Sequence, residues 1–407
     1  MQKRFIEEKL LSYLKFMPVV LIRGARQTGK TTLTHMLGKE NGYKFYNLDE
    51  ALELHNAGEN AVGWISQIEK PAIIDEVQKA PEIFLPIKVD VDQNRIPGRY
   101  LLTGSANPLL LPRMGDSLAG RMGIIDLFPF SQSEIRKKES SFINNIFANE
   151  MPAKSFSSLP KEELSDLLFR GGFPYVQTLS ESQISGWMGS YLQMILDRDV
   201  RDLSQIEGLR EFPLLFRLLA SRTGNLLNLS DVSRSLGISA PTLKRYISLL
   251  EALFFIYLLP GWYTNLGKRV TKSPKIHLCD TGILSYLLNA NEEKIENDPL
   301  LLGPMLETFV FTELQKMRSW SSIRFDLYHF RDLSHEVDFV LEQPDGTIVG
   351  IEVKSTHSIN SADLRGLRHL KSISKGKFFR GIVLYCGNQV GCYDDNLFVL
   401  PIQSLWG

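Results

Sequence analysis

The chain has 407 residues, of which 43% are hydrophobic and 23% are charged, and its formal net charge at pH 7 is zero. This composition is typical of a globular protein of two to four domains and excludes a disordered chain. The balanced charge excludes a global field that would attract nucleic acid or an anionic membrane, so any basic surface must be local.

Three further features favour a cytoplasmic protein with no membrane partner. The first residues, Met1–Lys9, are charged and lack the apolar core of a secretory signal. The longest apolar run, Ala252–Leu259, is too short to span a bilayer. The cysteines Cys279, Cys386 and Cys392 form neither a zinc-type pair nor a disulfide framework.

Short apolar runs alternate with helix-like segments through the first part of the chain. This rhythm predicts an α/β domain over residues 1–135, with a parallel sheet covered by helices. The expected strands are Val19–Ile22, Tyr43–Asn47, Ala72–Ile74, Tyr100–Thr103 and Gly123–Leu127.

A glycine-rich loop follows the first expected strand. Residues Gly24–Thr31 spell G-x-x-x-x-G-K-[ST], and a helix is expected to begin at Thr32. Strand, loop and helix in this order indicate a phosphate-binding loop, because backbone N–H groups and the helix N-terminus both attract an anion. We therefore expect ATP as ligand, with contacts from Gly24, Ala25, Arg26, Gln27, Thr28, Gly29, Lys30, Thr31 and Thr32.

Two acids end the third expected strand. Asp75 is expected to hold Mg²⁺ together with Thr31, and Glu76 to act as the general base that polarises the attacking water. Lys30 would neutralise charge on the β- and γ-phosphates. The alternative is a strand followed by an acidic helix cap.

Polar residues also follow the fourth expected strand. Thr103 or Ser105 is expected to touch the γ-phosphate or to orient the water, because parallel strand ends face the ligand crevice. A plain polar turn is the alternative. Arg121 is predicted to be the arginine that neutralises the transferred phosphate, either in its own chain or in a neighbouring subunit of a homo-oligomer.

The middle of the chain is predicted to be helical. We expect a linker and lid-like region over residues 136–225 and a winged-helix-like segment over residues 226–290. In that segment a helix, a turn at Gly237 and a second helix at Pro241–Leu250 are typical of a helix-turn-helix, with Thr242, Lys244 and Arg245 facing outward. Residues 201–275 carry 11 Lys plus Arg against 5 Asp plus Glu, which suits contact with DNA phosphates over residues 226–275. Plain packing or protein binding is the alternative.

The last predicted domain, residues 291–407, returns to mixed α and β structure. A hairpin is expected to bring Asp338 next to Glu352 and Lys354, and Glu307 is a fourth candidate from the preceding helix. Such carboxylates can hold Mg²⁺ or Mn²⁺ while the lysine activates water. A cross-strand salt bridge is the alternative.

Several motifs together resemble a bacterial and archaeal group of AAA-type P-loop ATPases that carries a C-terminal domain of unknown function. The motifs are Gly24–Thr31, Asp75–Gln78, Thr103–Ser105, Leu118–Arg121, Gly171–Pro174, Asp280–Gly282, Glu336–Asp338 and Glu352–Lys354. The resemblance implies an AAA-like ATPase core, a winged-helix-like segment and a C-terminal domain of restriction-endonuclease-like fold.

Three hypotheses follow for function. The first is a Mg²⁺-dependent ATPase whose hydrolysis changes the posture of its C-terminal domains, acting on DNA. The second is an ATP-gated DNA nuclease that uses Asp338, Glu352 and Lys354. The third is a nucleotide-switched binding or regulatory module without cleavage. The role of Asp197-Arg198-Asp199 is left open.

Overall fold

The computed structural model forms two compact units, residues 1–130 with 252–254, and residues 131–251 with 255–407. Residues 131–135 of the first predicted segment lie in the second unit, together with the three later segments except residues 252–254. The structure describes residues 2–105, 118–149, 151, 156–196, 211–265, 267, 269, 272–332 and 334–407. The motif Asp197-Arg198-Asp199 lies outside the described residues.

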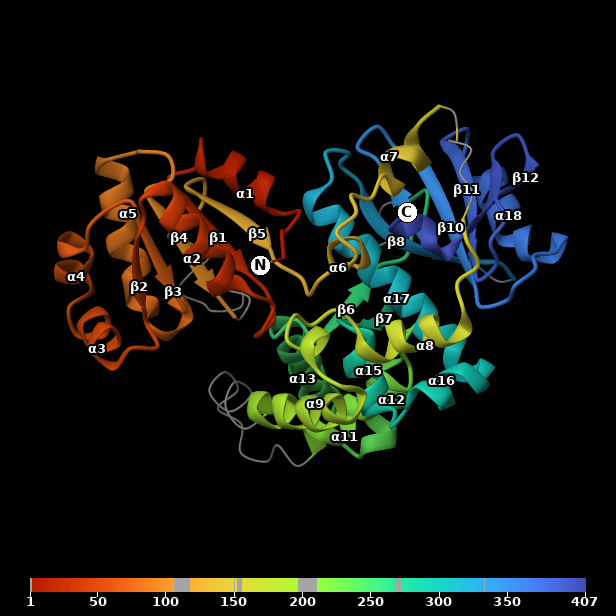
Figure 1. The fold of residues 1–407 in the computed structure, drawn as a ribbon, viewed down its shortest axis with the longest axis horizontal. Helices are drawn as coiled ribbons and strands as arrows, with labels where there is room; N and C mark the ends of the chain where they lie inside the picture. The colour runs from red at the N-terminus through yellow and green to blue at the C-terminus, as the bar shows by residue number, and fades with distance from the viewer. Residues whose placement is uncertain are drawn as a thin grey trace. The chain divides into compact units, whose positions relative to one another are not determined.

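The first unit contains a five-stranded sheet in which every pair of neighbours is parallel, as predicted (Figure 1). Its order is β2-β3-β4-β1-β5. The carboxyl ends of β1, β3 and β4 therefore meet at one edge, which is where open α/β sheets bind ligands. The strands are β1 (Val19–Arg23), β2 (Lys44–Asn47), β3 (Ala72–Asp75), β4 (Tyr100–Gly104) and β5 (Met122–Asp126).

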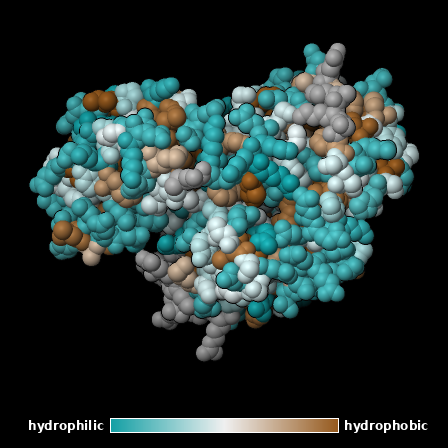
Figure 2. Space-filling model, in the orientation of Figure 1, coloured by the Kyte–Doolittle hydropathy of each residue, from teal (hydrophilic) through white to brown (hydrophobic). Residues whose placement is uncertain are grey.

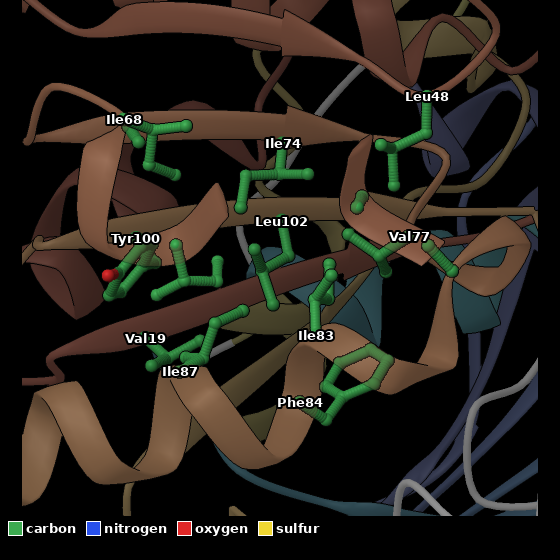
Figure 3. Packing of buried hydrophobic residues seen from close by; sticks show 14 of the residues in the cluster. Val19, Leu48, Ile68, Ile74, Val77, Ile83, Phe84, Ile87, Tyr100 and Leu102 are labelled. Carbon is green, nitrogen blue, oxygen red and sulfur yellow. The ribbon is translucent and has the colours of Figure 1, made fainter. Parts of the chain in front are cut away.

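Helices cover this sheet and close its core. Ile83, just before α5, and Phe84 and Ile87 in its first turn are buried, and Figure 3 shows them facing strand residues such as Val19 and Leu102. Each such side chain contributes about 1.5–3 kcal/mol when it leaves water. The helices are α1 (Glu7–Leu14), α2 (Lys30–Asn41), α3 (Ala51–Glu59), α4 (Ala61–Gln67) and α5 (Phe84–Gln93), with short 3₁₀ turns at Val77–Lys79 and Pro81–Ile83.

The second unit combines a helical part with a mixed six-stranded sheet of order β12-β13-β11-β10-β9-β8. The predicted hairpin is β9 paired antiparallel with β10. Strand β10 then pairs parallel with β11, and β11 pairs parallel with β13. The strands are β8 (Asp326–Arg331), β9 (Glu336–Glu342), β10 (Ile348–Lys354), β11 (Phe378–Tyr385), β12 (Gly391–Asp394) and β13 (Leu397–Pro401).

A separate two-stranded antiparallel sheet, β6 (Ile256–Leu259) with β7 (Lys275–Leu278), was not predicted. The helices of the second unit are α6 (Gln132–Ile135), α7 (Phe142–Phe147), α8 (Lys161–Arg170), α9 (Glu181–Ile195), α11 (Phe212–Ala220), α12 (Leu229–Leu236), α13 (Ala240–Ala252), α15 (Thr281–Leu287), α16 (Glu292–Asn297), α17 (Pro299–Trp320) and α18 (Arg365–Ile373). Short 3₁₀ turns occur at Val176–Thr178, Ser361–Leu364 and Ile402–Leu405.

Helices α12 and α13 follow each other across the predicted glycine turn. Gly237 has φ of 67°, a left-handed conformation that ends α12 at little steric cost. The apolar positions of α13 are buried as their spacing requires, namely Leu243, Tyr246, Ile247 and Leu250. Lys244 and Arg245 are exposed on the other face.

The motifs at Gly171 and Asp280 meet inside the second unit. The Asp280 carboxylate caps α15 by accepting from the N–H groups of Gly282 at 2.9 Å and Ile283 at 3.3 Å, and it also accepts from Gly172 N at 2.7 Å. Gly171 has φ of 65° and ψ of −151°, and a Cβ there would lie 2.1 Å from Asp280 Oδ1. These residues therefore join the end of α8 to the start of α15, which is a structural role.

The visible face of the molecule is mainly hydrophilic, with hydrophobic residues in small separate groups (Figure 2). Within the described parts of the chain, no helix has the length and apolar character needed to cross a membrane.

Gly171→Ala should lower the free energy of unfolding of the second unit by about 2–4 kcal/mol, because the new methyl group meets the buried Asp280 carboxylate in a strained backbone conformation. Urea unfolding measures this change. The matched control is Gly186→Ala in the middle of α9, where a Cβ meets nothing within 4 Å and helix propensity should raise stability slightly. Equal effects of the two substitutions would contradict the assigned role.

Candidate functional site

The phosphate loop leaves β1 and ends in the first turn of α2. Positive φ angles at Gly24 (156°), Gln27 (64°) and Gly29 (94°) curve its backbone. A Cβ at Gly24 would lie 2.2 Å from the Leu127 carbonyl oxygen, so only glycine fits there. The loop thus has the curvature that lets successive N–H groups converge on one anion.

Lys30 lies within the loop and is 4% exposed. Its ammonium donates to the carbonyl oxygens of Gly24 at 3.0 Å and Ala25 at 2.9 Å. The Thr28 hydroxyl donates to the same Ala25 oxygen at 2.9 Å. A bound phosphate would offer Lys30 charge-assisted hydrogen bonds, which are stronger than bonds to neutral carbonyls.

Asp75 connects the phosphate loop to the neighbouring strands. Its carboxylate accepts from the Thr31 hydroxyl at 2.9 Å and, on the other oxygen, from the Thr103 hydroxyl. Burial raises the pKa of Asp75, while the two hydroxyls and Lys30 counteract the shift. Thr31 and Asp75 offer the oxygen ligands that Mg²⁺ prefers, so the pair fits the predicted metal site.

Glu76 follows Asp75 in a left-handed conformation with φ of 59°, which is uncommon for a residue with a side chain. Its N–H donates to the Thr103 hydroxyl at 3.1 Å. Its carboxylate accepts from the Ser105 hydroxyl at 3.2 Å and from the Gln78 amide. The Gln78 amide also donates to Ser105 at 2.9 Å. Glu76 is therefore held by three neighbours.

The structure brings these predicted residues together at the carboxyl edge of the sheet. Lys30 and Thr31 begin α2 and Asp75 ends β3, with Glu76 directly after it. Thr103 lies near the end of β4, and Ser105 directly follows that strand. Arg26 is half-buried, whereas Gln27 and Thr32 are exposed on and beside the loop. The ATP contacts assigned to individual loop residues stay predictions.

Two residues of this site were not singled out from sequence. Gln78 belongs to the motif Asp75–Gln78, but its position in that motif does not by itself indicate a role. Arg4 is 6% exposed and donates to Thr28 O at 2.8 Å and to Phe128 O at 2.6 Å. Its guanidinium also lies 4.8 Å from the centre of the Phe130 ring. Arg4 therefore braces the phosphate loop against the segment that follows β5.

Arg121 does not reach the loop of its own chain. It precedes β5, whose first residue Met122 pairs with Val19 at the start of β1, so it lies at the amino edge of the sheet. Its guanidinium pairs with Asp92 and donates to Ala119 O at 3.1 Å. The expectation that Arg121 acts within its own chain is therefore withdrawn, and only action on a neighbouring subunit remains a prediction.

A second group of charged residues lies in the second unit. Asp338 on β9 accepts from the Val353 N–H of β10 at 2.9 Å, and the Lys354 ammonium donates to Glu352 at 2.6 Å. The predicted neighbours Asp338, Glu352 and Lys354 are thus brought together. Glu307, on α17, pairs with the same positively charged side chain as Asp338.

That cation is Lys275 of β7, which sequence reasoning missed. Its side chain is 1% exposed and its ammonium lies 2.8 Å from Glu307, 2.7 Å from Glu336 and 3.2 Å from Asp338. Burial opposes its charge, but these three carboxylates raise the pKa of Lys275 above its usual value. We call Lys275, Glu307, Glu336, Asp338, Glu352 and Lys354 the carboxylate cluster.

Burial and the Asp338 carboxylate together raise the pKa of Glu307 to about 8 and that of Glu352 to about 8. A carboxyl with a raised pKa keeps its proton at a pH where it is normally lost. Glu307 and Glu352 therefore each keep a proton near neutral pH, although Lys275 and Lys354 lie beside them.

Another group of three, Asp332, His335 and His369, has side-chain atoms within 4.8 Å of one another. The two imidazole rings stack at 4.1 Å with an angle of 12° between their planes. Rings that are nearly parallel cannot both direct an in-plane lone pair at one ion without rotating. We therefore assign no metal to these residues.

Three family models match parts of the chain. Residues 17–136 match the family described as AAA domain. This match supports an AAA-type P-loop ATPase domain in the N-terminal unit. Residues 161–294 and 302–405 match two families described as Domain of unknown function (DUF8612) and Domain of unknown function (DUF4143). The AAA domain supports ATP binding and hydrolysis in general, whereas the restriction-endonuclease-like fold of the last part stays a prediction.

Two mycobacterial proteins are similar over almost the whole chain. Each is named only as an uncharacterized protein, one from Mycobacterium bovis and one from Mycobacterium tuberculosis, and each is 29% identical over 409 residues, covering 99% of this chain and 84% of the relative.

Solved structures with distant similarity include the Walker-type ATPase PABY2304 of Pyrococcus abyssi, with a TM-score of 0.44 and 16% identity over 69% of this chain and 94% of that chain. The Thermotoga maritima RuvB Holliday junction branch migration motor has a TM-score of 0.31 and 18% identity, over 63% of this chain and 89% of that chain. These scores assign no role to any residue.

Glu307→Gln should make the stability of the second unit less dependent on pH between about pH 5 and pH 8. The folded protein keeps a proton on Glu307 up to about pH 8, whereas the unfolded chain releases it near pH 4.5. Stability is thus lost as pH rises through this window, by up to about 1.4 kcal/mol per pH unit for each retained proton. Urea unfolding at several pH values tests this, with the exposed Glu293→Gln as control. Equal slopes in the wild type and Glu307→Gln would contradict it.

Proposed function

We propose that this chain is a Mg²⁺-dependent ATPase that uses Lys30, Thr31, Asp75 and Glu76. The observation that carries the proposal is the Asp75 carboxylate, which accepts hydrogen bonds from both Thr31 of the phosphate loop and Thr103 of the neighbouring strand. This geometry supports the proposal, because it holds a carboxylate that could bind Mg²⁺ near the loop lysine that could bind phosphate, at the edge where open α/β sheets bind ligands, within the part of the chain that matches the AAA family.

Each residue of the proposed site has a chemical task. Lys30 and the loop N–H groups would hold the phosphates, and Thr31 with Asp75 would hold Mg²⁺, which neutralises the charge that develops on transfer. Glu76 would polarise the attacking water. Gln78 and Ser105 hold the Glu76 carboxylate and so position this base.

We further propose that the nucleotide state changes the posture of the second unit and that this unit acts on DNA. Support comes from α12 and α13, which are joined by the left-handed turn at Gly237 and expose Lys244 and Arg245. A short turn between two such helices, with basic side chains facing solvent, suits contact with phosphates.

A second candidate function is an ATP-gated nuclease, favoured by the gathering of Asp338, Glu352 and Lys354. The buried Lys275 weighs against it, because this lysine already binds Asp338 and Glu307. A nucleotide-switched binding module that recognises DNA or another partner without cutting is the third candidate, and it needs no metal in the carboxylate cluster.

Lys30→Ala should abolish tight ATP binding and turnover, whereas Glu76→Gln should keep ATP binding and lower turnover by about 100-fold or more. A fluorescent ATP analogue measures binding, and phosphate release measures turnover. The matched control is Lys39→Ala, an exposed lysine in the last turn of the same helix. Wild-type turnover in Lys30→Ala would overturn the proposed ATPase site.

Replacing Lys244 and Arg245 of α13 with alanine should weaken DNA binding and reduce the slope of log K against log [salt] by about 2, because each basic side chain that neutralises a phosphate contributes about one unit. Fluorescence anisotropy over a range of salt concentrations measures both quantities. Lys294→Ala on α16 is the control, since this lysine is exposed elsewhere in the same unit. Unchanged affinity and slope would exclude α13 as the DNA-binding helix.

The same DNA samples, with ATP and either Mg²⁺ or Mn²⁺, also separate the second and third candidates. ATP turnover is measured with and without DNA. Cuts that disappear in Asp338→Ala favour the nuclease, and intact DNA with slow turnover favours the binding module.

A further inference from the structure

Lys275 occupies the place in the carboxylate cluster where a bound cation would be stabilised best. It reaches the cluster from β7, whereas Glu307 belongs to α17 and Glu336 and Asp338 belong to β9. Its ammonium lies within 3.2 Å of a carboxylate oxygen from each of these three acids. Three carboxylates from two other elements thus converge on one buried positive charge.

A divalent metal would need the same oxygens. Mg²⁺ binds carboxylate oxygens at about 2.0–2.1 Å and tolerates little distortion. A metal bound to Glu307 and Asp338 would therefore stand within a few ångströms of the Lys275 ammonium, and the two cations would repel each other strongly in this buried setting. Lysine and metal are competitors for the cluster.

The cluster contains more acidic than basic side chains. Four acids, Glu307, Glu336, Asp338 and Glu352, surround two lysines. Among the described residues, the buried Oε2 atom of Glu352 has no hydrogen-bond partner. Without Lys275, a divalent cation would meet more uncompensated negative charge from these acids than it meets with Lys275 in place.

The strand that carries Lys275 is tied to the segment between α11 and α12. Ile276 N donates to Asn225 O at 3.0 Å, Gly224 N donates to Ile276 O at 2.8 Å, and Leu227 N donates to Pro274 O at 2.8 Å. The proposed DNA-contacting helix pair α12 and α13 begins directly after this segment. A movement of that pair would be transmitted to the backbone of Lys275.

We propose that Lys275 is an internal cation that closes the carboxylate cluster to divalent metal, and that withdrawal of β7 would open the cluster. This inference rests on the second candidate function in one respect, because both treat the carboxylate cluster as a potential metal site. It does not require that DNA be cut, and it is independent of the ATPase site.

Binding of Mn²⁺, followed by electron paramagnetic resonance on nucleotide-free full-length protein, tests the inference. Every protein carries Asp75→Asn, which removes the metal ligand of the AAA domain. At about 1 mM Mn²⁺, the protein that keeps Lys275 should bind no ion at the cluster. Lys275→Gln should bind one ion there, with an affinity at least 10-fold higher than that of the protein that keeps Lys275. Lys275→Arg, which keeps the charge, is the matched control and should bind none.

The added site should vanish in Lys275→Gln combined with Asp338→Asn. If Lys275→Gln unfolds easily without metal, its thermal unfolding with and without Mn²⁺ gives the same information, because an ion bound only by the folded state raises Tm. No gain of binding and no rise in Tm would overturn the inference. Tight Mn²⁺ binding with Lys275 in place, abolished by Asp338→Asn, would overturn it too, whether or not the Lys275 variants fold.

The same variants distinguish this inference from the nuclease function. Mn²⁺ binding by Lys275→Gln without DNA cutting would uphold the closed cluster and reject the nuclease. Cutting by the protein that keeps Lys275 would support the nuclease, whereas the closure is decided by the Mn²⁺ binding measured without DNA.

Discussion

The hydrogen bond from the Thr31 hydroxyl to the Asp75 carboxylate is the interaction on which the proposed ATPase site depends. It joins the start of α2 to the end of β3, although 44 residues separate the two in sequence. It can form because β1 and β3 flank β4 in a parallel sheet and therefore end at the same edge. Thr103 at the end of β4 binds the other Asp75 oxygen, so a single carboxylate positions three elements.

In the carboxylate cluster of the second unit, the negative charge is neutralised in a different way. In the N-terminal unit, the described residues that donate hydrogen bonds to the Asp75 carboxylate are the neutral hydroxyls of Thr31 and Thr103. In the second unit, Lys275 supplies a full positive charge from within the chain. The carboxylate cluster therefore already contains a cation, whereas the Asp75 site is the one proposed to bind a metal.

Local spacing explains which parts of the fold and site were predictable. The strands of the first unit are short apolar runs, and the β9–β10 hairpin follows from alternation around the turn at Gly346, so Asp338 and Glu352 could be paired from sequence. The contacts of Lys275 could not, because Asp338 lies 63 residues away and β6 and β7 have no distinctive pattern. Arg4 likewise binds Phe128 across 124 residues.

The prediction for Arg121 shows what local composition cannot decide, namely at which end of the sheet a loop lies. Its neighbours Ala119 and Gly120 suggested a tight, functional turn, but chain order alone does not say at which end of the sheet a loop lies. The residue precedes β5, so the parallel register with β1 places it at the edge away from the phosphate loop. Topology, rather than local composition, decided the outcome.

The close approach of Gly24 to the Leu127 carbonyl has a consequence for how sequence variation at this loop should be interpreted. A methyl group at position 24 would overlap main-chain atoms, which cannot rotate away as a side chain can. Gly24 would thus be retained even in a descendant of this chain that had lost the use of ATP. Its presence in a relative is evidence for the fold of the loop, while Lys30 and Glu76, whose backbones do not demand their side chains, are the positions that would drift first once hydrolysis no longer mattered.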